Sequence, residues 1–288
     1  MSHAFATESR FLPDEWHGPC IEAPHGSNSI STDREDSMPV PLPARSAARP
    51  RRSGPRPVGE VCGNRLIDAL PRGERARLLA AGKQVDLRPG GVLYEPDEPM
   101  RHAWFPLNGF VGLSTHPSHP ARMEVDLVGN EGMLGVALVL GVAESNQRAL
   151  VLGAGTALRI SAAALHREVR RNRVLPRLLH RYVYVLMMQF VQNATCIASH
   201  KIEQRLARLL LMSQDRASSE ALDITQASLA QMLGVRRVGV TEAAGALQRL
   251  GYIRYSRGHV AVTDRPGLER AACGCYRANC ASHERWLG

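Results

Sequence analysis

The stretch Gln226–Ala243, QASLAQMLGVRRVGVTEA, has the internal spacing of two short helices joined by a tight turn. Ala230 is small enough for a close helix crossing, and Gly234 falls at the turn, where a positive φ costs least without a side chain. Thr225 is a suitable N-cap for the first helix. The expected packing positions are apolar: Leu229, Leu233, Val235 and Val240. The pattern is typical of a DNA-binding helix-turn-helix, with an ordinary helical hairpin as the alternative.

Two strand-like segments follow this motif. Tyr252–Tyr255 and His259–Val262 are rich in β-branched and aromatic residues, and Ser256-Arg257-Gly258 supplies a tight turn between them. Such a hairpin is the wing of a winged helix-turn-helix, which lies on the DNA phosphates. The polar side chains of the hairpin that suit this role are Arg254, Arg257 and His259.

One face of the second helix is expected to read DNA bases, because it points away from the apolar packing positions. Its side chains are Arg236, Arg237, Val238, Thr241 and Glu242, with Gln226 of the first helix as a further DNA contact. An arginine fork fits the O6 and N7 acceptors of guanine, so Arg237 is the expected base reader.

Composition favours a polyanionic partner and a reducing compartment. The 288 residues carry a formal charge of +9, and aromatic residues make up only 5 %, which fits groove reading better than base stacking. The N-terminus lacks the features of a signal peptide, and the six cysteines do not form a disulfide framework. Polar residues interrupt the uncharged run Tyr182–Ser199, so we expect no membrane span and a cytoplasmic protein.

The chain divides into five segments by composition and pattern. We predict a disordered basic tail over residues 1–58, which either adds affinity for DNA phosphates or is simply solvated. Residues 59–172 are predicted to form a β-roll or jelly roll after a short helical hairpin broken at Pro71. The remaining predicted segments are a dimerisation helix (173–200), the winged helix-turn-helix (201–268) and a cysteine-containing tail (269–288).

Short strand-like pieces define the predicted β-roll. These pieces are Lys83–Leu87, Gly91–Tyr94, His102–Pro106, Phe110–Ser114, Met123–Val128, Ala149–Leu152 and Thr156–Ile160.

The predicted long helix, Pro176–His200, is apolar on several faces and is followed by the amphipathic helix Lys201–Ser213. A near-heptad repeat runs along the long helix and predicts a seam for a second subunit. The alternative is that the seam belongs to the intramolecular core. The residues assigned to the dimer contact are Leu179, Tyr182, Leu186 and Asn193.

A β-roll, a long helix and a C-terminal winged helix-turn-helix, in this α+β order, resemble the Crp/Fnr family of bacterial transcription regulators. The resemblance covers about residues 62–265 and is sharpest at VGNEGMLGV (Val128–Val136), the IEQRLARLLL helix and the helix-turn-helix. It implies a cyclic-nucleotide-binding-like sensor domain and a homodimer on a palindromic operator, with RNA polymerase as a partner.

The ligand of the cyclic-nucleotide-binding members is not expected here. Their Gly-Glu-x-Gly turn, whose acid contacts ribose, corresponds to Gly132-Met133-Leu134-Gly135, and their Arg-Ser/Thr pair is missing beside Arg148. These five residues are the expected effector pocket, and the cofactor or effector remains unknown. A cyclic-nucleotide-responsive or a redox- or metal-responsive regulator is the alternative.

Other chemistry is weaker in this sequence. Cys20 and Cys62 are too few and too far apart for the family's iron–sulfur cluster. His116, His119 and Glu124 loosely match a cupin metal motif, which would make a metal enzyme fused to a DNA-binding domain. Free tail thiols are expected, with zinc as the alternative for Cys273, Cys275, Cys280 and His283. We therefore expect no enzyme.

Overall fold

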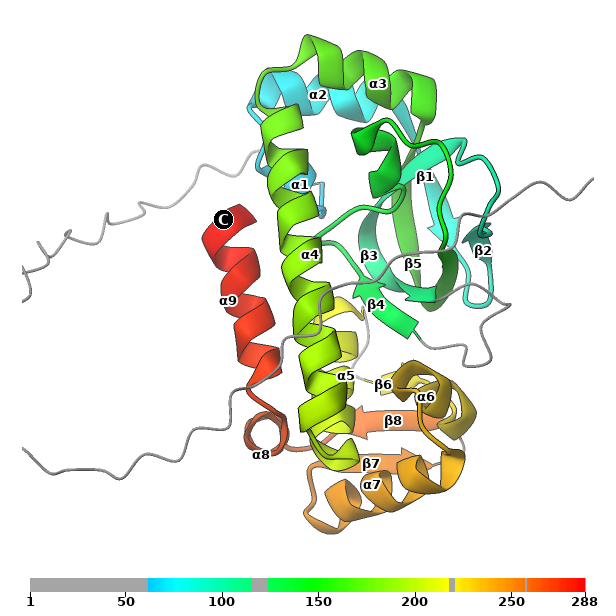
Figure 1. Ribbon diagram of the computed structural model, residues 1–288, viewed down its shortest axis with the longest axis vertical. Coiled ribbons are helices and arrows are strands. Elements are labelled where there is room, and N and C mark those ends of the chain that lie inside the picture. Colours follow the sequence, from blue (N-terminus) through cyan, green and yellow to red (C-terminus); the bar gives the residue numbers. More distant parts are fainter. Residues whose placement is uncertain (1–61, 115–123, 218–220, 257, 288) are drawn as a thin grey trace, which may run out of the picture. The chain divides into compact units, whose positions relative to one another are not determined.

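The computed structural model describes residues 62–114, 124–217, 221–256 and 258–287 (Figure 1). The predicted basic tail (1–58), Cys20, the histidines of the cupin alternative (His116 and His119) and Arg257 lie outside the described residues. Glu124 is described by its backbone alone.

The N-terminal half of the described chain is built on an antiparallel sheet in the order β1-β5-β3-β4, with β2 paired to β5 (Figure 1). The strands are β1 (Gly82–Leu87), β2 (Val92–Tyr94), β3 (His102–Ser114), β4 (Glu124–Val128) and β5 (Arg148–Ser161). The mixed α+β class, with an antiparallel sheet before the helices, agrees with the prediction.

The two longest strands were each predicted as two shorter pieces. β3 and β5 are continuous but change register at Asn108 and Phe110, which are irregular positions of a β-bulge kind. Between them Gly109 has a φ of 73°, and a Cβ there would lie 2.6 Å from the carbonyl oxygen of Ala154. The glycines that suggested turns in the sequence therefore bend continuous strands.

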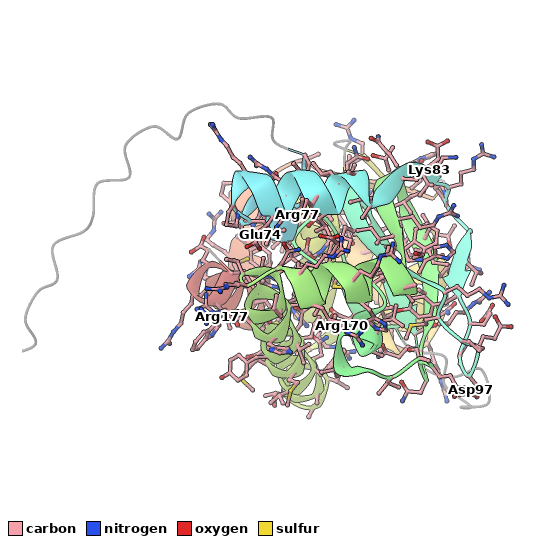
Figure 2. The ribbon with its side chains drawn as sticks, turned by 90° about the horizontal axis from the view of Figure 1, so that it is seen from above. Glu74, Arg77, Lys83, Asp97, Arg170 and Arg177 are labelled. Carbon is pink, nitrogen blue, oxygen red and sulfur yellow. The ribbon has the colours of Figure 1, made fainter. Side chains whose placement is uncertain are left out.

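Short helices pack against the sheet and share an apolar cluster with β3 and β5. They are α1 (Arg65–Asp68), α2 (Arg72–Ala80), η1 (Val136–Leu140) and α3 (Ala162–Arg171). The pattern did not predict α3. Arg77 of α2 donates a hydrogen bond to Asn172 just after α3 and lies 4.0 Å from Glu168, and Figure 2 shows α2 and α3 side by side. Buried Asn64 caps α1 and donates to the carbonyls of Pro106 and Gly132.

The long helix α4 (Leu175–Ser199) agrees with the predicted helix to within one residue at each end. Three of the four residues predicted to contact a second subunit are not at the surface. Leu179, Tyr182 and Leu186 are 0 %, 1 % and 6 % exposed and belong to the core that α4 forms with the β-domain. They pack with Phe105, Met133 and Ile160 in this core, so they are covered by the chain itself and do not face a second subunit.

The C-terminal half contains α5 (Ile202–Arg216), β6 (Ala221–Asp223), α6 (Gln226–Leu233), α7 (Arg237–Arg249), β7 (Ile253–Ser256) and β8 (His259–Val262). The strands form a three-stranded sheet in the order β6-β8-β7, so the predicted wing gains one strand. One apolar cluster joins α5, α6, α7 and this sheet.

The predicted tail is helical in the part that the structure describes. Helix α8 (Arg265–Ala271) crosses the predicted boundary between the DNA-binding segment and the tail, α9 (Cys275–Leu287) makes up most of the tail, and α9 lies alongside α4 (Figure 1). The rings of Trp286 on α9 and Tyr184 on α4 meet edge to face, with their centroids 5.2 Å apart. Within the described residues, every helix is too short or too polar to cross a membrane.

Candidate nucleic-acid interface

The helix-turn-helix is formed by α6 and α7, and its local geometry follows from residues singled out in the sequence. Thr225 Oγ1 accepts a hydrogen bond from the Ser228 backbone N–H at 3.1 Å, which caps α6. Gly234 ends α6 in the left-handed region, with φ 64° and ψ 38°. Leu229 and Val240 are buried where the two helices pack. The expected turn chemistry is thus present.

One face of α7 is exposed while the opposite face is buried. Val240, Ala243, Ala244 and Leu247 are buried against the domain core. The exposed side chains are those that the sequence assigned to DNA reading: Arg236, Arg237, Val238, Thr241 and Glu242. Val238 is 66 % exposed, so its side chain is open to a partner on this face.

The side chain of Gln226 is held by a hydrogen bond to α7. Its Oε1 accepts a hydrogen bond from Thr241 Oγ1 at 3.1 Å, so it connects the first turn of α6 to the exposed face of α7. Thr241 Oγ1 also lies 3.1 Å from the carbonyl oxygen of Arg237. The structure therefore brings Gln226 together with the predicted reading face.

The wing places Arg254 of β7 at the surface, as expected for a phosphate contact. His259 of β8 is exposed but lies 2.5 Å from the carboxylate of Asp223 on the neighbouring β6. The sequence pattern gives no signal for β6, so it does not place this acid beside His259. Asp223 makes His259 a weaker candidate for a phosphate than Arg254, since an acid at that position repels the anion.

A second apolar surface lies on α4, in a different register from the predicted seam. Tyr184, Met187 and Val191 are 43 %, 58 % and 59 % exposed and repeat at three- and four-residue spacing, which continues at exposed Ala194 and Ala198. This set of five residues, the α4 stripe, has the heptad spacing of a coiled-coil seam. Asn193 of the predicted seam is only half-buried and does not belong to it.

Three of the five predicted effector residues line a cavity of about 390 Å³ in the β-domain, and the other two, Gly132 and Arg148, do not. Met133, Leu134 and Gly135 line the cavity, together with the segment 144–147. Arg148 instead pairs with Glu95, with its Nε 3.1 Å from the carboxylate oxygen. The described lining contains Glu144 and neither lysine nor arginine, which disfavours an anionic phosphate.

Gly132 connects this turn to α4. A Cβ at Gly132 would lie 2.2 Å from the Tyr182 hydroxyl, and that hydroxyl donates a hydrogen bond to the Met133 carbonyl at 3.1 Å. Tyr182, one of the predicted dimer contacts, thus holds the pocket turn against α4 of its own chain.

A buried charged network, which the sequence analysis missed, joins the β-domain to α5. Arg216 and Glu131 form an ion pair at 2.8 Å, with side chains 9 % and 12 % exposed. Burial is the largest single influence and acts to raise the pKa of Glu131, but the charges of Arg216 and His283 and two backbone N–H hydrogen bonds together hold that pKa below its usual range. Asp126 is 4 % exposed and accepts from Gln189, and burial raises its pKa to about 7.

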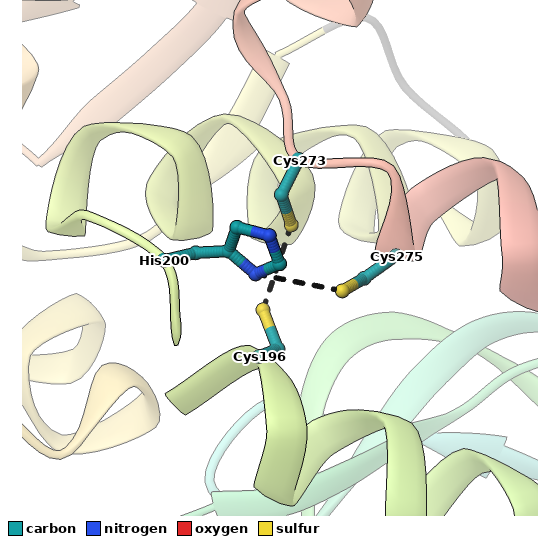
Figure 3. Close-up of side chains that lie close together, drawn as sticks. All are labelled: Cys196, His200, Cys273 and Cys275. Carbon is teal, nitrogen blue, oxygen red and sulfur yellow. Dashed lines mark hydrogen bonds between the residues drawn. The ribbon is translucent and has the colours of Figure 1, made fainter. Parts of the chain in front are cut away.

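The four tail residues of the zinc alternative do not converge. Cys273 and Cys275 lie together with Cys196 and His200 at the end of α4, as Figure 3 shows. Cys280 is exposed, and His283 lies 3.2 Å from the Gln189 side-chain oxygen. The zinc alternative built on Cys280 and His283 is therefore corrected, because α9 carries these two residues away from the other thiols.

Comparison with known proteins identifies a Crp-like helix-turn-helix domain over residues 204–271. The fold is similar to FixK2 from Bradyrhizobium japonicum, with a TM-score of 0.57, 14 % identity, and coverage of 67 % of this chain and 98 % of that one. It is also similar to a CRP/FNR-family transcriptional regulator from Thermus thermophilus, with a TM-score of 0.53, 23 % identity, and coverage of 66 % of this chain and 98 % of that one. No curated protein matches the sequence. The predicted fold is confirmed.

Proposed function

We propose that this chain, which has the fold of CRP/FNR transcriptional regulators and carries a Crp-like helix-turn-helix domain, is a homodimeric regulator that binds a two-fold-symmetric operator. The exposed face of α7 supports this proposal most directly. It presents Arg236 and Arg237 at the start of the helix while the opposite face is buried. RNA polymerase is the proposed protein partner, and the cytoplasm is the proposed location, since the target is chromosomal DNA.

In this proposal Arg237 reads a base and Arg254 holds a phosphate. Arg237 is the first residue of α7, where an arginine reaches a base edge when the helix enters the major groove. Arg254 lies on the wing, which runs beside the DNA backbone in a winged helix-turn-helix.

Binding-site selection with the full chain tests these roles. Arg237→Ala should cost about 1–3 kcal/mol on the selected site and relax discrimination at one base pair in each half-site. Arg254→Ala should weaken all sequences similarly and lower the salt dependence of binding. Arg249→Ala, an exposed arginine at the far end of the same helix, is the matched control. A uniform loss for Arg237→Ala would make that residue a phosphate contact and contradict the assignment.

The dimer is proposed to form through the α4 stripe. Two copies of a helix with Tyr184, Met187 and Val191 exposed at heptad spacing would bury apolar surface that a single chain leaves in water. The two-fold symmetry of such a contact would match the symmetry of the operator.

Cyclic AMP is not the proposed effector. The described lining of the β-domain cavity has Met133 at the turn, Glu144 nearby and no cation, and Glu95 already holds Arg148. Calorimetric titration of cyclic AMP and cyclic GMP should therefore give little or no heat. Micromolar affinity, lost on Arg148→Ala, would show that Arg148 leaves Glu95 for the phosphate.

A further inference from the structure

We infer that Cys196, His200, Cys273 and Cys275 form a tetrahedral structural zinc site that fastens the C-terminal helix to the end of α4 (Figure 3). The inference is independent of which DNA sequence or effector the protein recognises. It rests on the convergence of four side chains from two segments that are far apart in the sequence.

The spacing of the donor atoms fits one metal ion. The four ligand atoms all lie within 4.8 Å of one another. The Cys196 and Cys273 sulfurs are 3.5 Å apart, and the Cys275 sulfur is 3.6 Å from His200 Nδ1. With a Zn–S bond of about 2.3 Å and a Zn–N bond of about 2.0 Å, a tetrahedral site separates two sulfurs by about 3.8 Å and a sulfur from a nitrogen by about 3.6 Å.

The set of donors also fits zinc in kind. Three thiols and one imidazole are the ligands of a closed structural zinc site, and thiolates select soft metals over magnesium or calcium. Cys196 lies in the last turn of α4 and His200 is its C-cap residue, whose backbone N–H bonds the Cys196 carbonyl, so the two side chains start close together. Four protein ligands leave no position for a substrate, which makes the site structural.

Burial argues against three ordinary free thiols. Cys196, Cys273 and Cys275 are 1 %, 4 % and 3 % exposed and form a buried cluster separate from the larger apolar clusters of the described residues. A cysteine used as a small hydrophobic residue is expected to pack among apolar side chains. Here the three sulfurs instead gather beside an imidazole.

The surroundings of the four ligands support the site through a hydrogen bond and through charge. The Gln192 side-chain amide donates a hydrogen bond to the Cys275 sulfur at 2.9 Å, a contact that orients and stabilises a thiolate ligand. Zinc with three thiolates has one net negative charge. A second cavity, of about 350 Å³, is lined by Cys196 together with Arg205 and Arg208 of α5. Positive charge therefore lies close enough to compensate the negative charge of the zinc site.

The position of the site indicates what the metal would hold. Cys273 lies in the connection between α8 and α9, Cys275 is the first residue of α9, and His200 stands between α4 and α5. Bound zinc would fix α9 along α4 and also fix the junction that leads into the DNA-binding half.

Metal content of the full chain, purified under argon without added metal, is the first test. We expect about one zinc per chain, lost in Cys273→Ser and in Cys275→Ser. Cys280→Ser, an exposed cysteine on α9, is the matched control and should keep its zinc. Equal zinc loss in Cys280→Ser, or wild-type protein that holds no zinc, would overturn the proposal.

A Co²⁺ titration of zinc-stripped wild-type protein keeps the test independent of how the variants fold. Tetrahedral thiolate coordination should give a thiolate-to-cobalt charge-transfer band and strong visible absorption, saturating at about one equivalent. Weak octahedral absorption would contradict the site. A Cys196–Cys273 disulfide in the argon-purified protein, seen by intact mass, would also contradict it, because an oxidised pair cannot bind the metal.

Discussion

At the scale of single residues, the charged groups between the β-domain and α5 are the least expected feature of this protein. Asp126 has one oxygen bonded by Gln189 and the Leu127 backbone, while its other oxygen is buried without a hydrogen-bond partner. Burial therefore favours the protonated acid, whose pKa rises from 3.8 to about 7 despite the nearby charge of Arg216. Glu131, under the same Arg216 side chain, stays ionised.

This difference gives a pH prediction. Between about pH 4 and pH 7 the folded protein holds a proton on Asp126 that the unfolded chain releases, so this group makes stability fall as pH rises. The effect has an upper bound of about 4 kcal/mol, at about 1.4 kcal/mol for each pKa unit. Asp126→Asn should remove it, so the variant gains stability relative to wild type as pH rises from 5 to about 7.

Urea unfolding at a series of pH values measures this gain. Asp86→Asn, which removes an exposed carboxylate on β1, is the matched control. A difference between Asp126→Asn and wild type that stays constant across the series would show that Asp126 does not carry the titration.

At the scale of elements, α4 carries two different apolar surfaces. One faces the β-domain through Leu179, Tyr182 and Leu186, and the other is the exposed α4 stripe. Both repeat along the same helix, so a helical pattern in the sequence does not say which surface faces the chain's own core. Next to the stripe, α9 covers the helix: Trp286 of α9 packs against Tyr184 at the edge of the stripe, and His283 lies near Gln189.

Two substitutions on α4 should therefore act differently. Val191→Asp should give folded monomers, because a symmetric contact would bury two unpaired carboxylates at a cost of several kcal/mol each. The dissociation constant should rise by about a hundredfold or more. Leu186→Asp, 6 % exposed in the core, should unfold the protein instead of only separating subunits.

Light scattering and circular dichroism distinguish these outcomes. Leu140→Asp, 58 % exposed on η1, matches the 59 % exposure of Val191 and should leave the assembly intact. If Val191→Asp remains dimeric, another surface forms the dimer.

At the scale of the whole described molecule, the ion pair between Arg216 and Glu131 joins the C-terminal end of α5 to the turn after β4. Gly129, in the same turn, donates its backbone N–H to Glu131, and a Cβ at Gly129 would lie 2.6 Å from the Arg216 side chain. The contact is tight and buried, so each charge depends on the other.

Removing one partner should cost more than removing both. Arg216→Met should destabilise the protein by about 3–5 kcal/mol, because it leaves Glu131 buried without its counter-ion. The double variant Arg216→Met with Glu131→Gln should recover most of this loss. Thermal unfolding of both variants checks the prediction, and a double variant as unstable as the sum of its single variants would mean that the pair is not energetically coupled.

The sequence by itself determined the elements with strong local signals. Thr225, Gly234 and the apolar spacing around Leu229 specify the helix-turn-helix, because capping, a positive φ and helical periodicity are local properties. The long helix and most strand positions follow from the same kind of pattern. The face of α7 that stays exposed follows too, since burial of Val240 leaves Arg237 and Thr241 outside.

Only the tertiary structure decided which distant residues meet. Cys196 and Cys273 are 77 residues apart, and Arg216 is 85 residues from Glu131, so no local spacing connects them. Cys280 and His283, nearer in sequence to the other tail ligands, are carried away on α9. The same holds for α4, because its free face depends on where the β-domain and α9 pack. Packing of separate elements, which periodicity does not encode, sets these contacts.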